Sequence, residues 1–183
     1  MVFNRETALS ELKARVKNVN LLKHMYASEA CLRRLAVHFR ADEELWGLAG
    51  LVHDIDLEIV AGDMDRHAIE GAGILKELGA PAEITDAVLA HNNKKPPESV
   101  LEKALFAADP LTGLIVACAL MHPSKKISNL DKEFVLKRFK EKRFAAGASR
   151  EQIKSAETLG ISLDQFIVIC LAGMTGVSGE LGL

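Results

Sequence analysis

The residues of this sequence best suited to chemistry are His53 and Asp54, which stand side by side after the apolar pair Leu51-Val52. Adjacent residues of a regular helix point about 100° apart, so these two can reach one point only where a helix ends or distorts. A neutral imidazole and a carboxylate together suit Fe, Mn, Zn or Ni better than Ca or Mg. A polar cap at a helix C-terminus is the alternative interpretation of the same dipeptide.

Further residues of the same chemical types lie at predicted helix ends, helix breaks or apolar helix faces: His24, His67, His91 and Asp109. For His24, on an apolar stripe, a hydrogen-bonded core histidine is the alternative. Asp109 precedes Pro110 within an apolar run, so it could bind a metal or cap a helix that starts at Pro110. The whole set suits two neighbouring cations bridged by Asp54, because a carboxylate has two oxygens whereas an imidazole offers one lone pair.

Helices have to position these residues, because apolar side chains recur at helical spacing and no alternating strand pattern occurs. Pro110 should kink the chain or end a helix at Asp109. Residues 56–65 are acidic and contain Gly62, which predicts a loop. The expected helices span about residues 9–16, 21–39, 43–54, 67–78, 81–91, 100–109, 111–121, 130–144, 150–159 and 163–174.

Composition narrows the class of protein. The 183 residues are enough for one domain with a substantial core, and the net charge of −2 predicts neither a nucleic-acid nor a membrane partner. The longest apolar run, around residues 105–120, contains a charge and a proline and is too short to span a bilayer. Three scattered cysteines and an N-terminus without a signal-peptide core predict a reducing, cytoplasmic location.

The order of His24, His53-Asp54 and Asp109 on a helical chain resembles the HD superfamily of metal-dependent phosphohydrolases, in an uncharacterised bacterial branch of the HDIG type. The resemblance covers about residues 21–120. It departs from the family pattern at Asp56, where the family commonly has glycine.

The resemblance implies an all-α fold, namely an HD-domain helical bundle with additional C-terminal helices. One domain would cover residues 1–183, with its core at about 20–122 and a helical extension at about 123–183.

The family pattern also implies a function, the hydrolysis of a phosphate ester or phosphoanhydride in a nucleotide-like substrate by a metal-bound hydroxide. One or two divalent transition metals (Fe, Mn, Ni, Co or Zn) would be bound by His24, His53, Asp54, His67, His91 and Asp109. Asp54, His67 and His91 are expected to act in catalysis. Alternatively, His67 and His91 could line the pocket and hydrogen-bond the substrate phosphate.

Other polar residues near these positions are candidates for supporting roles. Those expected to contact substrate are Lys23, Arg66, Lys94, Lys95 and Thr112. Asp56, Asp63 and Asp65 could accept a hydrogen bond from a metal-binding imidazole. The expected partner is a small-molecule phosphate substrate, and a second copy of the chain could form a homodimer.

Two other classes of function remain open at this point. A diiron oxygenase would use the same ligands with a redox-active iron pair. A non-catalytic helical module would bind a nucleotide or a protein, and the basic helix around Lys132–Arg143 together with the apolar C-terminal helix suits such an interface.

Overall fold

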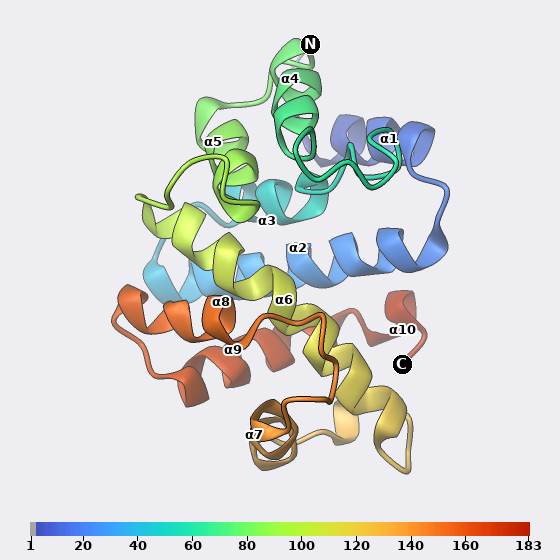
Figure 1. Cartoon of the computed structure of the whole chain (residues 1–183), viewed down its shortest axis with the longest axis vertical. Helices are drawn as coiled ribbons and strands as arrows, with labels where there is room; N and C mark the ends of the chain where they lie inside the picture. Colours follow the sequence, from blue (N-terminus) through green and yellow to red (C-terminus); the bar gives the residue numbers. More distant parts are fainter. Residues whose placement is uncertain (1–2) are drawn as a thin grey trace.

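A computed structural model describes residues 3–183, which form α-helices and two 3₁₀ turns without any β-strand (Figure 1). The all-α expectation is confirmed. The elements are α1 (Arg5–Arg15), α2 (Val19–Phe39), α3 (Glu43–Val52), α4 (Ile69–Glu77), α5 (Ala82–His91), α6 (Val100–Met121), η1 (Ile127–Asn129), α7 (Lys132–Lys140), α8 (Arg150–Lys154), η2 (Ser155–Leu159), α9 (Leu163–Gly176) and α10 (Ser178–Leu181).

Helix α2 runs across the middle of the molecule, with α3, α4 and α5 on one side and α7, α9 and α10 on the other (Figure 1). Helix α3 starts where the Asp42 carboxylate accepts the backbone N–H groups of the first turn. At Gly50, an added Cβ atom would lie 2.7 Å from the backbone of Ser28. This close crossing fixes the end of α3, and therefore His53, over α2.

Helix α6 is continuous through Pro110, so of the two predicted outcomes, a kink or an end, the end at Asp109 is wrong. Proline removes one backbone hydrogen bond, but a helix buried on both sides of it can retain its course through tertiary packing. Leu105, Leu111 and Leu114 are fully buried around this point. The helix has 22 residues and is apolar enough to cross a membrane, contrary to the short run expected, but 56% of its most apolar window is buried inside the bundle. It serves as a core helix of this fold.

The C-terminal elements pack on the same two long helices. Helix α9 crosses α2 so closely that a Cβ atom added at Gly173 would lie 2.5 Å from the carbonyl oxygen of Ala30. Helix α8 and η2 pack against α6, and α7 against α6 and α9. Two elements are shorter than predicted: α7 ends at Lys140, and the helix expected over 150–159 divides into α8 and η2.

Candidate metal centre

The six candidate ligands come together at the centre of the N-terminal half, from five separate elements or their ends. His24 lies on α2, His53 and Asp54 follow α3, and Asp109 lies in the middle of α6. The other two are His67, in the turn before α4, and His91, the last residue of α5. That they bind metal stays a prediction, while their proximity is a feature of the fold.

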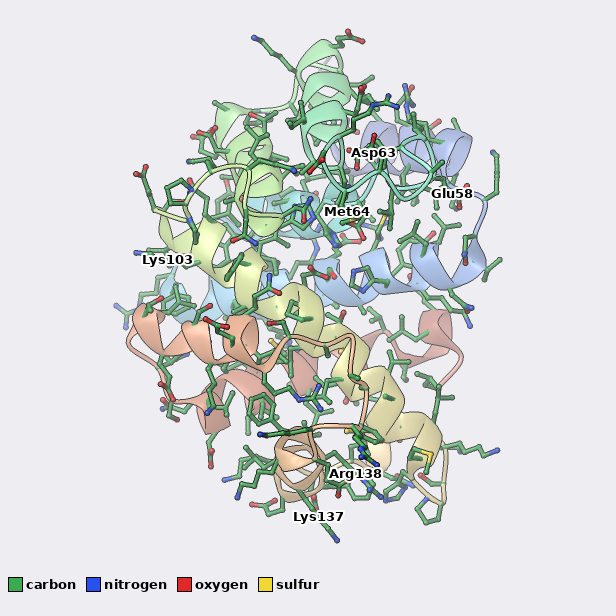
Figure 2. All side chains as sticks on the ribbon, viewed as in Figure 1. Glu58, Asp63, Met64, Lys103, Lys137 and Arg138 are labelled. Carbon is green, nitrogen blue, oxygen red and sulfur yellow. The ribbon has the colours of Figure 1, made fainter. Side chains whose placement is uncertain are left out.

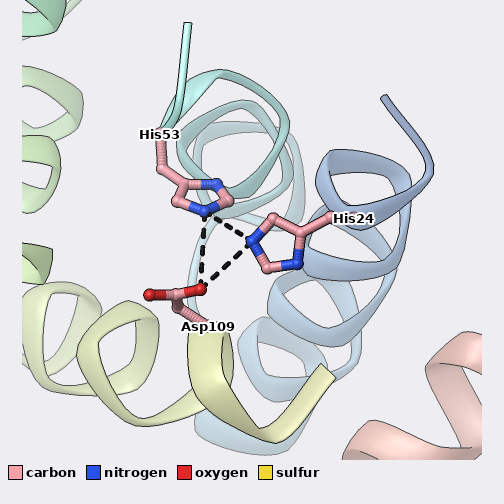
Figure 3. A group of neighbouring side chains, drawn as sticks. All are labelled: His24, His53 and Asp109. Atoms are coloured by element: carbon pink, nitrogen blue, oxygen red, sulfur yellow. Dashed lines mark hydrogen bonds and ion pairs between the residues drawn. The ribbon is translucent and has the colours of Figure 1, made fainter. Parts of the chain in front are cut away.

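His24, His53 and Asp109 form the first half of the cluster (Figure 3). The Nε2 atoms of His24 and His53 are 3.1 Å apart. One oxygen of Asp109, Oδ1, lies 3.1 Å from Nε2 of His24 and 3.8 Å from Nε2 of His53. Three donor atoms therefore face one point between α2, α3 and α6.

Asp54 joins this group to a second one. Its Oδ2 atom lies 3.7 Å from Nε2 of His24 and 3.5 Å from Nε2 of His53. Its Oδ1 atom lies 3.2 Å from Nε2 of His67 and 3.3 Å from Nε2 of His91. The carboxylate thus has one oxygen toward each pair of imidazoles, which is the arrangement needed to bridge two cations.

Backbone carbonyls hold two of the imidazoles in the orientation that a ligand requires. Nδ1–H of His53 donates to the carbonyl oxygen of Gly50 at 2.9 Å, and Nδ1–H of His91 donates to that of Val88. Each acceptor lies three residues earlier, in the last turn of the same helix. Because the proton is on Nδ1 in this tautomer, the Nε2 lone pair is left for the interior of the cluster.

Thr112 orients His24, a role that the sequence did not predict, while its expected contact with substrate stays a prediction. Its hydroxyl donates to the backbone carbonyl of Asp109 at 2.8 Å and accepts Nδ1–H of His24 at 2.9 Å. The residue is fully buried. It lies one turn after Asp109 on α6, so a single helix supplies both a candidate ligand and the group that orients another.

Asp56, the residue that departs from the family pattern, holds His67. Its Oδ1 accepts Nδ1–H of His67 at 2.9 Å, as was expected of one of the nearby aspartates. Its Oδ2 accepts the backbone N–H groups of Ala68 and Gly71, both at 2.8 Å. Ala68 has a φ of 69°, a strained conformation for alanine that this fully buried carboxylate stabilises.

Asp63 and Asp65 do not share this role. Asp63 lies on the exposed loop between α3 and α4 (Figure 2), where its side chain accepts the backbone N–H of Asp65. Figure 2 also shows Glu58 of the same loop, which accepts the backbone N–H groups of Lys17 and Asn18. The carboxylate of Glu58 therefore fastens the loop to the start of α2.

The charges of the cluster depend on one another. Burial alone would lower the pKa of His53, but the negative charges of Asp54 and Asp109 outweigh this effect and raise the pKa to about 9. Burial also opposes the rise for His67, whose pKa reaches about 9 because of its hydrogen bond to Asp54. Despite burial, His53 and His67 hold the pKa of Asp54 well below its usual range, and His24 and His53 lower that of Asp109. Without a bound cation, protons on the imidazoles thus compensate the negative charges of the two carboxylates.

The donor set fits divalent transition metals. Four imidazole Nε2 atoms and two carboxylates provide mixed nitrogen and oxygen ligands, which suit Fe, Mn, Co, Ni or Zn. Neighbouring lone pairs only about 3 Å apart repel one another unless a proton or a cation lies between them. The cluster can therefore hold one or two such ions.

Two of the four basic residues predicted to contact substrate form ion pairs elsewhere. The guanidinium of Arg66 pairs with Glu70 at 2.9 Å on the exposed face of α4. The ammonium of Lys95 pairs with Glu102 at 3.0 Å, at the start of α6. Both side chains already have an acidic partner, and their contact with substrate stays a prediction.

The other two predicted lysines are not placed at the cluster by any contact of the described residues. The ammonium of Lys23 would be 3.0 Å from a Cβ atom added at Gly182, so its side chain extends toward the C-terminus of the chain. Lys94 is half-buried just after α5. Their contact with substrate stays a prediction.

The family model of the HD domain matches residues 21–122, from α2 to the end of α6. The chain belongs to the HD domain family. HD domain proteins form a superfamily of metal-dependent phosphohydrolases, which confirms the resemblance drawn from His24, His53-Asp54 and Asp109. The matched region contains all six candidate ligands.

Curated relatives of this HD domain include two proteins named Ribonuclease Y. That of Oleidesulfovibrio alaskensis is 33% identical over 106 residues, which is 57% of this chain and 20% of the relative. That of Desulfotalea psychrophila is 34% identical over 94 residues, 51% of this chain and 18% of the relative. The chain thus spans about a fifth of the length of these relatives. No solved structure was significantly similar to it.

Two features of the structure were not predicted from the sequence. The carboxamide of Asn92 donates to the backbone carbonyl of His67 at 3.3 Å, which ties the end of α5 to the turn before α4. Residues 145–148, between α7 and α8, line a cavity beside His24 and Asp109. The signal for Asn92 was its position next to His91, whereas the small residues of 145–148 look like any surface loop in sequence.

Proposed function

We propose that this protein hydrolyses a phosphate ester or phosphoanhydride of a small, nucleotide-like molecule. The observation that carries the proposal is the orientation of Asp54, which directs one oxygen to His24 and His53 and the other to His67 and His91. Such a bridge suits a pair of cations that act together on one phosphoryl group. Membership of a phosphohydrolase superfamily supports the same reaction.

When bound, divalent cations would lower the pKa of a water molecule and attract the phosphoryl oxygens. The residues of the chain have other tasks. Asp54 sets the spacing of the two halves, Thr112 and Asp56 orient His24 and His67, and burial of His53 and His91 excludes bulk water. His24 and Asp109 are more exposed and leave one side of the cluster free for a phosphate.

A second candidate is cleavage of an RNA phosphodiester, which the name of the relatives favours. The bond type and the metal requirement would be the same. We place it second because the match covers only a fifth of those proteins, and because a chain with a net charge of −2 provides little general attraction for a polyanion. The oxygenase alternative would require iron and oxygen.

The test uses the full chain loaded separately with Mn or Fe and a substrate panel of nucleoside monophosphates, dinucleoside polyphosphates and a short RNA. We expect phosphate or nucleotide release with Mn in the absence of oxygen. Asp54→Asn should lower the rate by about 10³-fold or more, since both halves lose a charged ligand.

Asp63→Asn is the matched control, because it makes the same change on an exposed loop and should leave the rate unchanged. Release from RNA alone would favour the second candidate. A protein that retains its metal and releases nothing from the panel would contradict the proposal, and oxygen uptake with iron would support the oxygenase.

A further inference from the structure

The cluster is accessible from one side. The side chains of His24 and Asp109 are 23% and 27% exposed, whereas those of Asp54, His67 and His91 are at most 10% exposed and that of His53 is buried. A phosphate can therefore approach only across α2 and α6, and whatever is attached to that phosphate has to lie on the same side.

A cavity of about 380 Å³ lies on this side. It is at the lower end of the size range of small-molecule pockets. Its walls are His24, Asp109, Pro110, Gly113, Ala145, Ala146, Gly147 and Ala148. Apart from the two candidate ligands, none of these residues carries a charge or a side chain larger than proline. The cavity suits a compact, uncharged group and provides no cation for a second phosphate of a polymer.

Gly113 is notable because the packing of the protein does not require a glycine there. It lies inside α6, where glycine destabilises a helix by about 0.5–1 kcal/mol relative to alanine. A Cβ atom added at Gly113 would meet no atom within 4 Å. The open space that it would enter is the cavity beside Asp109, so the missing side chain keeps room there for a ligand.

The opposite wall is held in place by Arg150, the first residue of α8. Its guanidinium donates to the carbonyl oxygens of Ala145 and Ala148, both at 2.8 Å, and also to that of Phe144. Its Nε–H donates to the carbonyl of Phe139 at 3.1 Å. A single side chain thus holds several backbone carbonyls of this loop in place.

We propose that this cavity binds the uncharged, nucleoside-sized group of the substrate, and that residues 145–148 limit its size. The inference rests on the proposed function and deepens it, because it assigns a substrate-binding role to a segment outside the matched family region of residues 21–122. Gly113 is then a specificity-determining residue, and Arg150 is a positioning residue that acts through the loop.

The test measures binding rather than turnover. Two phosphonates whose carbon–phosphorus bond resists hydrolysis are titrated calorimetrically into the Mn-loaded full chain: methylphosphonate and adenosine 5′-methylenephosphonate. We expect the adenosine compound to bind about tenfold more tightly or better, and to slow hydrogen exchange at the amides of residues 144–149. Both effects should follow from contacts in the cavity.

Gly113→Leu should remove this preference, because its side chain would fill the cavity. The affinity for the adenosine compound should fall by about tenfold, while that for methylphosphonate stays within about twofold. Gly73→Leu is the matched control, since Gly73 also lies inside a helix, α4, and likewise has no atom within 4 Å of an added Cβ. It should change neither affinity.

Arg150→Lys provides a second variant. Lysine retains the charge but cannot span several carbonyls, so hydrogen exchange at residues 144–149 should increase and the adenosine preference should fall, with methylphosphonate binding unaltered. Equal affinities of the two phosphonates for the wild-type chain, or a Gly113→Leu variant that keeps the preference, would overturn the inference while leaving the proposed function standing. Failure of both phosphonates to bind would contradict the proposed function itself.

Discussion

The two halves of the cluster use the same ligand types but differ in their surroundings. His24 and Asp109 are partly exposed and face a cavity, and His24 is oriented by a hydroxyl. His67 and His91 are almost fully buried, and His67 is oriented by the buried carboxylate of Asp56. We therefore expect the first half to meet substrate and the second, which is closed to solvent, to hold an ion.

Removing one imidazole from each half should produce the largest effect. We expect His24→Ala and His67→Ala each to lower the metal content from about two ions per chain to about one, with a loss of activity of about 10³-fold. Elemental analysis of the purified variants measures the content. If His67→Ala leaves the metal content unchanged, the second half is not a metal site and its histidines line the pocket instead.

Proton competition should act on both halves. His53 and His67 have pKa values of about 9 in the folded, metal-free chain, above the ordinary value of 6.5. Because these pKa values are raised, the two protons stabilise the metal-free fold fully below pH 6.5, and this stabilisation is lost as the pH rises through about 9. Metal binding displaces the protons, so the affinity for Mn should increase by about tenfold per pH unit and per site up to that pH.

Thermal unfolding between pH 6 and pH 9.5, with and without a chelator, checks the proton competition. The melting temperature of the metal-free chain should decline over this range while Mn-dependent stabilisation grows. Parallel trends in the two samples would show that protons and metal do not share the imidazoles.

Replacing Asp56 should affect the second half alone. Asp56→Gly restores the residue common in the family but removes the acceptor for His67, Ala68 and Gly71. We expect the affinity of the second ion to fall by about 10–100-fold, with the first ion unaffected. Stepwise calorimetric titration with Mn separates the two sites, and equal losses at both would argue against two independent halves.

Thr112→Val should give the smallest change and should be confined to the first half. The valine keeps the shape but loses the hydroxyl that accepts Nδ1–H of His24. We expect a loss of about tenfold in the affinity of the first ion. Thr112→Ser should restore most of it; if the serine variant is as weak as the valine variant, the role of the residue is packing rather than orientation.

Local sequence patterns predicted much of the fold. Apolar spacing identified the helices, and Asp42 and Ser162 cap α3 and α9 because their short side-chain oxygens satisfy free N–H groups at helix starts. The exception was Pro110. There, a strong local signal for a helix end was overridden by the burial of α6 residues before and after the proline. Local propensity determines where a helix begins and ends when packing is weak, whereas tertiary packing determines it in the core.

The sequence by itself determined the ligand candidates, since His53-Asp54 and Asp109 are ionisable groups in apolar segments that require partners. Only the tertiary structure decided how they are shared between two halves, that Thr112 and Asp56 orient imidazoles, and that residues 145–148 face His24 across a cavity. Residue types and spacing indicate what each segment needs locally, such as a partner for a buried charge. The approach of α2 to a segment as distant in sequence as residues 145–148 depends on how every helix in between packs.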